Sequence, residues 1–289
     1  MQNRRRIWWR ARGVEQLNSR FSEPSVLRIL DSRVADGRPV RVLEIGCGEA
    51  HALMALAWRY RQQNVSFVGV NDLPTNTMAG PEDLRDACID FDICSWQNTS
   101  RLRLPKLIFT DAGNRLPFAD GAFDVVLSSA TFPYIINKAR ALMEVWRVLD
   151  FDGTALIHLD SFDPKMPDFM NTAGNPHLFT PRFVIYDKER NRVPTADYLA
   201  RFGRRGFGIQ LEPSAAKATN TVIRISRQSK KELDLRLILD ELSTIAHMEA
   251  HLSSRQAGGE YLWWGTRSVF FIDEATSRSN LEGHRALRR

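Results

Sequence analysis

The fold is decided by one short stretch of the chain, Val42-Leu43-Glu44-Ile45-Gly46-Cys47-Gly48-Glu49-Ala50. The run from residue 40 to residue 45 is apolar and rich in β-branched residues, which is typical of a buried strand. Two glycines one residue apart follow, and residues 50–61 then combine good helix formers with an apolar stripe. Glycines between a strand and a helix let a ligand approach the backbone at the helix N-terminus. The stretch therefore predicts a ligand-binding strand–turn–helix unit.

Strand and helix patterns alternate along the rest of the N-terminal half. Strands are predicted at residues 40–45, 65–70, 107–110, 123–128 and 153–159, with helices over 50–61 and 138–149. Two further strands, at 207–211 and 221–225, are close enough to form an antiparallel hairpin. The alternation predicts an α/β fold, a doubly wound and mostly parallel sheet closed by an antiparallel final hairpin.

The chain of 289 residues is long enough for one large domain with additions. We expect a helical preamble over residues 1–38, the α/β domain over 39–228 and a C-terminal extension over 229–289. The extension is predicted to hold a long helix over 230–252 and a strand over 261–272. The helix carries an apolar stripe too large to leave in water, so we expect it to form a lid over a ligand pocket or a dimer interface. The stripe consists of Leu233, Leu237, Leu242, Ile245, Met248 and Leu252.

The position of Glu44 favours one kind of ligand. Dinucleotide enzymes prefer the pattern G-x-G-x-x-G, and the third glycine of that pattern is replaced here by His51. A carboxylate two residues before the first glycine suits a ligand with an ammonium group. S-adenosylmethionine (SAM) has such a group and the pyrophosphate of a dinucleotide does not, so SAM is favoured over NAD.

Further motifs, in order, make the sequence resemble the class I SAM-dependent methyltransferases, a Rossmann-like family. They are the stretch 42–50, the strand end at 67–72, the segment Thr110–Val126, and residues 144–149 followed by Gly153. The resemblance covers roughly residues 40–160. It implies a ribose contact at Asn71, or at Asp72 beside it, and an adenine contact at Asp111 and the Ala112 backbone. The predicted cofactor site consists of Glu44, Gly46, Cys47, Gly48, Asn71, Asp72, Asp111, Ala112 and Ser128.

Several of these residues also have a purely structural interpretation. Asp111 could cap the turn that follows it, and Cys47 could be a small packing residue. Asn71 and Asp111 are 40 positions apart, whereas a compact unit needs about 20 to 25. An insertion is therefore expected between Leu73 and Pro105, as a loop at the cofactor edge or as a peripheral excursion.

The catalytic group is not fixed by any motif. Tyr134, after the fourth strand, and His177, in a proline-flanked loop that could reach a substrate, are the catalytic candidates. His158 lies within a strand pattern and is expected to be buried. His247 and His251 are one helical turn apart, but a solvated helix face explains them better than a metal pair, and no metal is predicted. A base is needed only if the acceptor must first lose a proton.

The composition favours a small-molecule acceptor that is methylated on O, N or C. The net charge is +6, but 33 Arg and 7 Lys are scattered among acidic residues, so nucleic acid is not the expected partner. No apolar run suggests a membrane span, and three unpatterned cysteines suit a reducing cytoplasm. A homodimer is possible. An RNA or protein methyltransferase and a non-catalytic, partner-binding subunit are the alternatives.

Overall fold

The computed structural model describes residues 13–72, 81–129, 131–132, 135, 138–159, 182–186, 192–193, 200, 202–203, 207–213, 221–228, 245–255 and 261–270. Tyr134, His177 and most of the predicted helix over 230–252 lie outside the described residues. Among the residues that are described, no helix is both long and apolar enough to cross a membrane.

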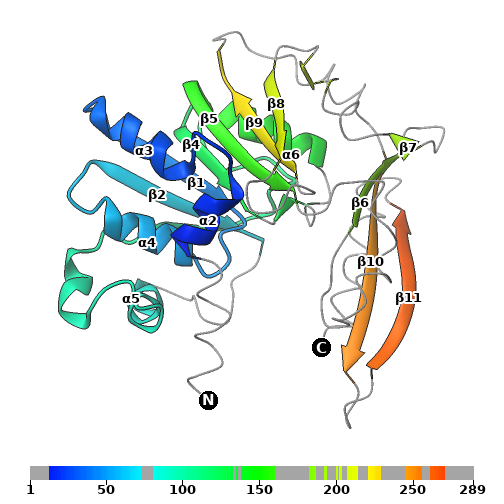
Figure 1. Cartoon of the computed structure of the whole chain (residues 1–289), viewed down its shortest axis with the longest axis horizontal. Coiled ribbons are helices and arrows are strands. Elements are labelled where there is room, and N and C mark those ends of the chain that lie inside the picture. The colour runs from blue at the N-terminus through cyan, green and yellow to red at the C-terminus, as the bar shows by residue number, and fades with distance from the viewer. Residues whose placement is uncertain are drawn as a thin grey trace.

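In the described part of the chain, the main sheet has seven strands in the order β3-β2-β1-β4-β5-β9-β8 (Figure 1). Strand β1 is parallel to both β2 and β4, whereas β9 is antiparallel to both β5 and β8. The predicted mostly parallel sheet with a closing hairpin is therefore confirmed. The strands are β1 Val40–Ile45, β2 Val65–Asn71, β3 Lys106–Phe109, β4 Phe123–Ser128, β5 Leu149–Leu159, β8 Gly208–Pro213 and β9 Thr221–Ser226.

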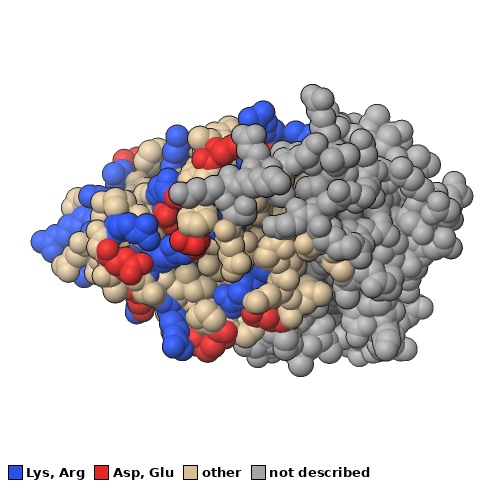
Figure 2. Space-filling model, turned by 90° about the horizontal axis from the view of Figure 1, so that it is seen from above, with Lys and Arg blue, Asp and Glu red and all other residues tan. Residues whose placement is uncertain are grey.

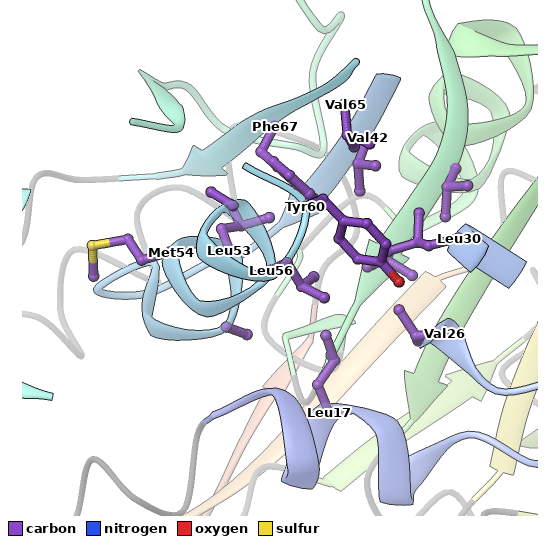
Figure 3. Packing of buried hydrophobic residues seen from close by; sticks show 14 of the residues in the cluster. Leu17, Val26, Leu30, Val42, Leu53, Met54, Leu56, Tyr60, Val65 and Phe67 are labelled. Carbon is purple, nitrogen blue, oxygen red and sulfur yellow. The ribbon is translucent and has the colours of Figure 1, made fainter. Parts of the chain in front are cut away.

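Successive residues of a strand point to opposite sides of its sheet, and β1 carries apolar residues on both sides. Helices therefore cover both faces of this sheet. Val40 and Val42 of β1 join one apolar cluster with residues of α2, α3 and α4 (Figure 3). Leu43 and Ile45 join a second cluster with residues of α6. The helices are α2 Val14–Arg20, α3 Val26–Ala35, α4 His51–Arg59, α5 Pro81–Asp90 and α6 Lys138–Val148. Strand order reverses between β1 and β4, and ligands bind at such a switch point in open α/β sheets.

The expected insertion between Leu73 and Pro105 is not a plain loop. Its described part forms α5 and the 3-10 helix η1 (Trp96–Arg101). Leu84 and Cys88 are buried, and the Cys88 sulfur lies 3.4 Å from the sulfur of Met54 in α4. Proline at the first helical position and acidic residues in the first turn are ordinary helix-start signals, and they explain α5. The loop prediction is therefore wrong over α5 and η1.

A second sheet of four described strands has the order β11-β10-β6-β7. Its strands are β6 Arg182–Tyr186, β7 Arg192–Val193, β10 Ile245–Arg255 and β11 Tyr261–Phe270. The strand predicted at 261–272 is confirmed, but the helix predicted over 230–252 is wrong where β10 lies. Pairing of β10 with both β6 and β11 supplies hydrogen bonds that a local helical pattern does not anticipate. His247 and His251 therefore lie on a strand, not on a helix.

Candidate functional site

The turn between β1 and α4 contains backbone conformations that favour glycine. Gly46 has φ +74° and Gly48 has φ +56°, both in the left-handed region. Ala50, at φ +55°, occupies the same region without being glycine, at a cost of about 1 to 2 kcal/mol. The strand end, the turn and the start of α4 thus present a tightly curved backbone at the switch point of the sheet.

Asn71, at the end of β2, fixes this turn from the side. Its Oδ1 accepts a hydrogen bond from the Gly48 N–H at 3.0 Å, and its Nδ2 donates to the Gly48 carbonyl at 2.6 Å. A carboxylate could accept the first bond but could not donate the second. The two-sided contact is a physical reason for Asn, and not Asp or Glu, at the end of β2. Asp72, the other candidate for the ribose contact, is exposed beside it.

Glu44 is a buried carboxyl group, only 5% exposed. Its Oε2 has no hydrogen-bond partner among the described residues. Burial raises the pKa of Glu44 to about 8, and the charge of Arg20 opposes that rise. Burying a carboxyl with an unpartnered oxygen is costly, which is expected where a cationic ligand supplies the missing contact.

Thr131 closes the site over Gly46. Its hydroxyl donates to the Gly46 carbonyl at 3.1 Å and contacts the Ser129 carbonyl at 3.2 Å. A Cβ at position 46 would overlap the Thr131 side chain, so glycine is required there for space as well as for conformation. The sequence did not single out Thr131 as a site residue, because no local pattern shows that the segment after β4 crosses the turn after β1.

Asp111 lies in the segment that follows β3. Its Oδ1 accepts from the Gly113 N–H at 2.7 Å, and its Oδ2 accepts from the Asn114 side-chain amide at 3.4 Å. This is the capping geometry considered as the structural interpretation. These two bonds do not use all the lone pairs of the carboxylate, so Asp111 can still accept a hydrogen bond from an adenine amino group. Ala112 is buried against the cluster on the α6 side of the sheet.

A buried ion pair fixes the chain just beyond Asp111. Arg147 donates to Glu144 at 2.6 Å and to the carbonyls of Leu116 and Phe118 at 3.0 and 2.8 Å. Glu144 also accepts from the Leu116 N–H at 2.8 Å. Helix α6 thereby positions the segment after the predicted adenine contact.

The two remaining predicted cofactor residues differ in their surroundings. The Cys47 sulfur packs against Gly69, where an added Cβ would lie 2.5 Å from it. Burial, and then the charge of Glu44, raises the pKa of the Cys47 thiol, which favours packing over nucleophilic chemistry. Ser128, at the end of β4, is fully buried, and its hydroxyl has no hydrogen-bond partner in the described part of the chain.

The described cofactor candidates meet at one edge of the sheet. They occupy or follow the carboxyl ends of β1, β2, β3 and β4, which is where ligands bind in open α/β sheets. Within the described ranges, no group of three or more His, Cys, Asp or Glu could hold a metal ion.

Comparison with known proteins agrees with this geometry. A family described as "Methyltransferase domain" matches residues 43–157, the region from β1 to β5 that builds this edge. Residues 43–157 thus match a methyltransferase domain, in agreement with the resemblance to the class I SAM-dependent methyltransferases. The matched residues include Glu44, both glycines of the turn, Asn71 and Asp111.

Two curated relatives are similar over part of their length. A Geobacter sulfurreducens protein named malonyl-[acyl-carrier protein] O-methyltransferase is 32% identical over 127 residues, covering 44% of this chain and 41% of the relative. A Bacillus cereus protein of the same name is 24% identical over 135 residues, covering 46% of this chain and 42% of the relative. The chain therefore spans less than half the length of these relatives.

Among solved structures, a SAM-dependent methyltransferase from Aquifex aeolicus is similar at 12% sequence identity and a TM-score of 0.39. The alignment covers 68% of this chain and 88% of that chain.

Proposed function

We propose that this chain transfers the methyl group of SAM to a small-molecule acceptor. The observation that carries the proposal is Glu44, a buried carboxyl with an unpartnered oxygen beside the glycine turn of a methyltransferase domain. A structural carboxyl at this depth would normally be fully hydrogen-bonded. The ammonium group of SAM supplies both the charge and the donors that Glu44 lacks.

The other described residues fit the remaining parts of SAM. The curved backbone at Gly46 and Gly48 admits the ligand, Asp72 would accept from the ribose hydroxyls, and Asp111 with the Ala112 N–H would face the adenine. SAM supplies a methyl group on a positively charged sulfur, which is already activated for transfer. The work left to the chain is to hold the acceptor in line with that methyl group and to exclude water.

The acceptor class that we favour presents an oxygen nucleophile. Both curated relatives are named malonyl-[acyl-carrier protein] O-methyltransferase, and a malonyl group that is attached at one end has a carboxylate at its free end. A carboxylate has already lost its proton at neutral pH, so its methylation needs no base. Tyr134 and His177 are then proposed as acceptor contacts, not as proton acceptors.

The distribution of charge supports a small molecule over nucleic acid. Figure 2 shows Lys and Arg interspersed with Asp and Glu on the described part of the face in view. A phosphate backbone is bound by a continuous basic surface, which the described part of this face does not present.

We further propose that the extension over residues 229–289 helps to build the acceptor side. Its strands β10 and β11 share a sheet with β6, which follows β5 along the chain. The alternative role is a dimer interface. Sedimentation of the full chain distinguishes the two, since a monomer supports the lid and a dimer supports the interface.

The proposed activity is tested with SAM carrying an isotopically labelled methyl group. The purified full chain is incubated with a malonyl thioester, and matched reactions contain its methyl ester or an acetyl thioester. We expect label in an ester product from the malonyl thioester only. Turnover of other small molecules would support the methyltransferase activity and overturn the proposed acceptor. SAM binding without turnover on a broad small-molecule panel would favour the non-catalytic alternative.

A further inference from the structure

Arg20, the last residue of α2, reaches the same edge of the sheet from outside the matched domain. Its guanidinium donates to the Ser129 hydroxyl, although the two residues are 109 positions apart. The Ser129 carbonyl contacts the Thr131 hydroxyl, which donates to the Gly46 carbonyl. These contacts link Arg20 to the turn after β1 and to the residue directly after β4, at the switch point of the sheet.

The backbone around Arg20 is anchored on both sides. Leu17, one turn earlier, and Phe21, the next residue, are 3% and 2% exposed. The Phe21 ring meets the His158 ring of β5 edge-on, with centroids 6.3 Å apart. Arg20 itself is only partly buried, so a fixed backbone holds a charged group that solvent and ligands can still reach.

Arg20 and Glu44 place a guanidinium and a carboxyl group at one edge of the sheet. Arg20 is close enough to Glu44 to lower the pKa of that buried carboxyl against the effect of burial. Glu44 Oε2 nevertheless has no hydrogen-bond partner among the described residues. A carboxyl and a guanidinium presented together are complementary to a ligand that carries both an ammonium and a carboxylate group.

We propose that Arg20 is the carboxylate-binding residue of this site. The inference rests on the proposed function. The carboxylate belongs either to the amino-acid end of SAM or to the acceptor, and the planar guanidinium suits both by paired N–H donation. Helix α2 is then part of the ligand site, and the N-terminal segment is more than a preamble to the domain.

The first test measures binding, which does not depend on turnover. Calorimetry compares the wild type with Arg20→Gln and Arg20→Lys for two probes, S-adenosylhomocysteine and 5′-methylthioadenosine, which lacks the amino-acid end. If Arg20 holds the cofactor carboxylate, Arg20→Gln lowers the affinity for S-adenosylhomocysteine roughly 10- to 100-fold. The affinity for 5′-methylthioadenosine is then unchanged. Arg20→Lys keeps the positive charge, so its affinity for S-adenosylhomocysteine should fall less than that of Arg20→Gln. The matched control is Arg28→Gln on α3, whose side chain is 73% exposed, and it should change neither affinity.

The second test covers the acceptor as the source of the carboxylate. In that case S-adenosylhomocysteine affinity is unchanged in Arg20→Gln, and KM for the malonyl thioester rises by roughly tenfold or more with little change in kcat. Unchanged affinity together with unchanged KM would overturn the inference and leave the proposed function intact. An equal loss for both probes would also overturn it, because that pattern indicates structural damage. A wild-type chain that binds neither probe would overturn the inference and the proposed function together.

Discussion

Replacing Glu44 with Gln should stabilise the free protein and abolish SAM binding. In the folded protein burial raises the pKa of Glu44 to about 8, from an ordinary value of 4.5. Between these two values the unfolded chain releases the proton and the folded chain keeps it, so wild-type stability falls as pH rises. Each pH unit costs about 1.4 kcal/mol, and the two and a half units from 4.5 up to pH 7 cost about 3.5 kcal/mol. Gln has no proton to release and avoids this loss.

The assay is urea unfolding of both ligand-free proteins at pH 5, 6, 7 and 8. The stability advantage of Glu44→Gln should be small at pH 5, should grow to about 3.5 kcal/mol at pH 7 and should level off above pH 8. The control is Glu15→Gln, at an exposed position of α2, and it should show no comparable growth. A pH-independent difference, or a variant less stable than wild type at pH 8, would refute the reasoning. Retained affinity for S-adenosylhomocysteine would refute the assignment of Glu44 to the ammonium group.

Three further predictions concern the turn and its support. Gly48→Val should abolish S-adenosylhomocysteine binding in calorimetry, because a branched side chain at φ +56° distorts the turn and fills the space of the ligand. Ala50→Gly should raise the free energy of unfolding by about 1 kcal/mol, because it relieves a left-handed conformation; a loss of stability would show that the strain is not real. Arg147→Met should lower the free energy of unfolding by about 3 to 5 kcal/mol, because it leaves the Glu144 carboxylate buried without its ion-pair partner. The double variant Glu144→Gln/Arg147→Met should regain part of that stability, as measured by thermal unfolding.

Local sequence patterns were sufficient to predict most strands of the main sheet. The apolar run of β1, the glycines after it and the helix formers of α4 occur in consecutive residues, so the unit is visible in the sequence. The closing hairpin of β8 and β9 was predicted for the same reason.

What the sequence did not reveal depends on contacts between distant residues. Strand β10 exists because β6 and β11 pair with it, and its own apolar spacing favours a helix. The contact of Arg20 with Ser129 joins residues that no local pattern connects. Asn71 was identified as a site residue, but its two bonds to Gly48 became visible only when β1 and β2 were placed side by side.

The most direct test of the central claim is calorimetric titration of the purified full chain with SAM, with NAD as the matched comparison. A SAM site built around Glu44, the glycine turn and Asp111 should give one binding event with a dissociation constant on the order of micromolar, and NAD should give none. Tight NAD binding without SAM binding would contradict the account.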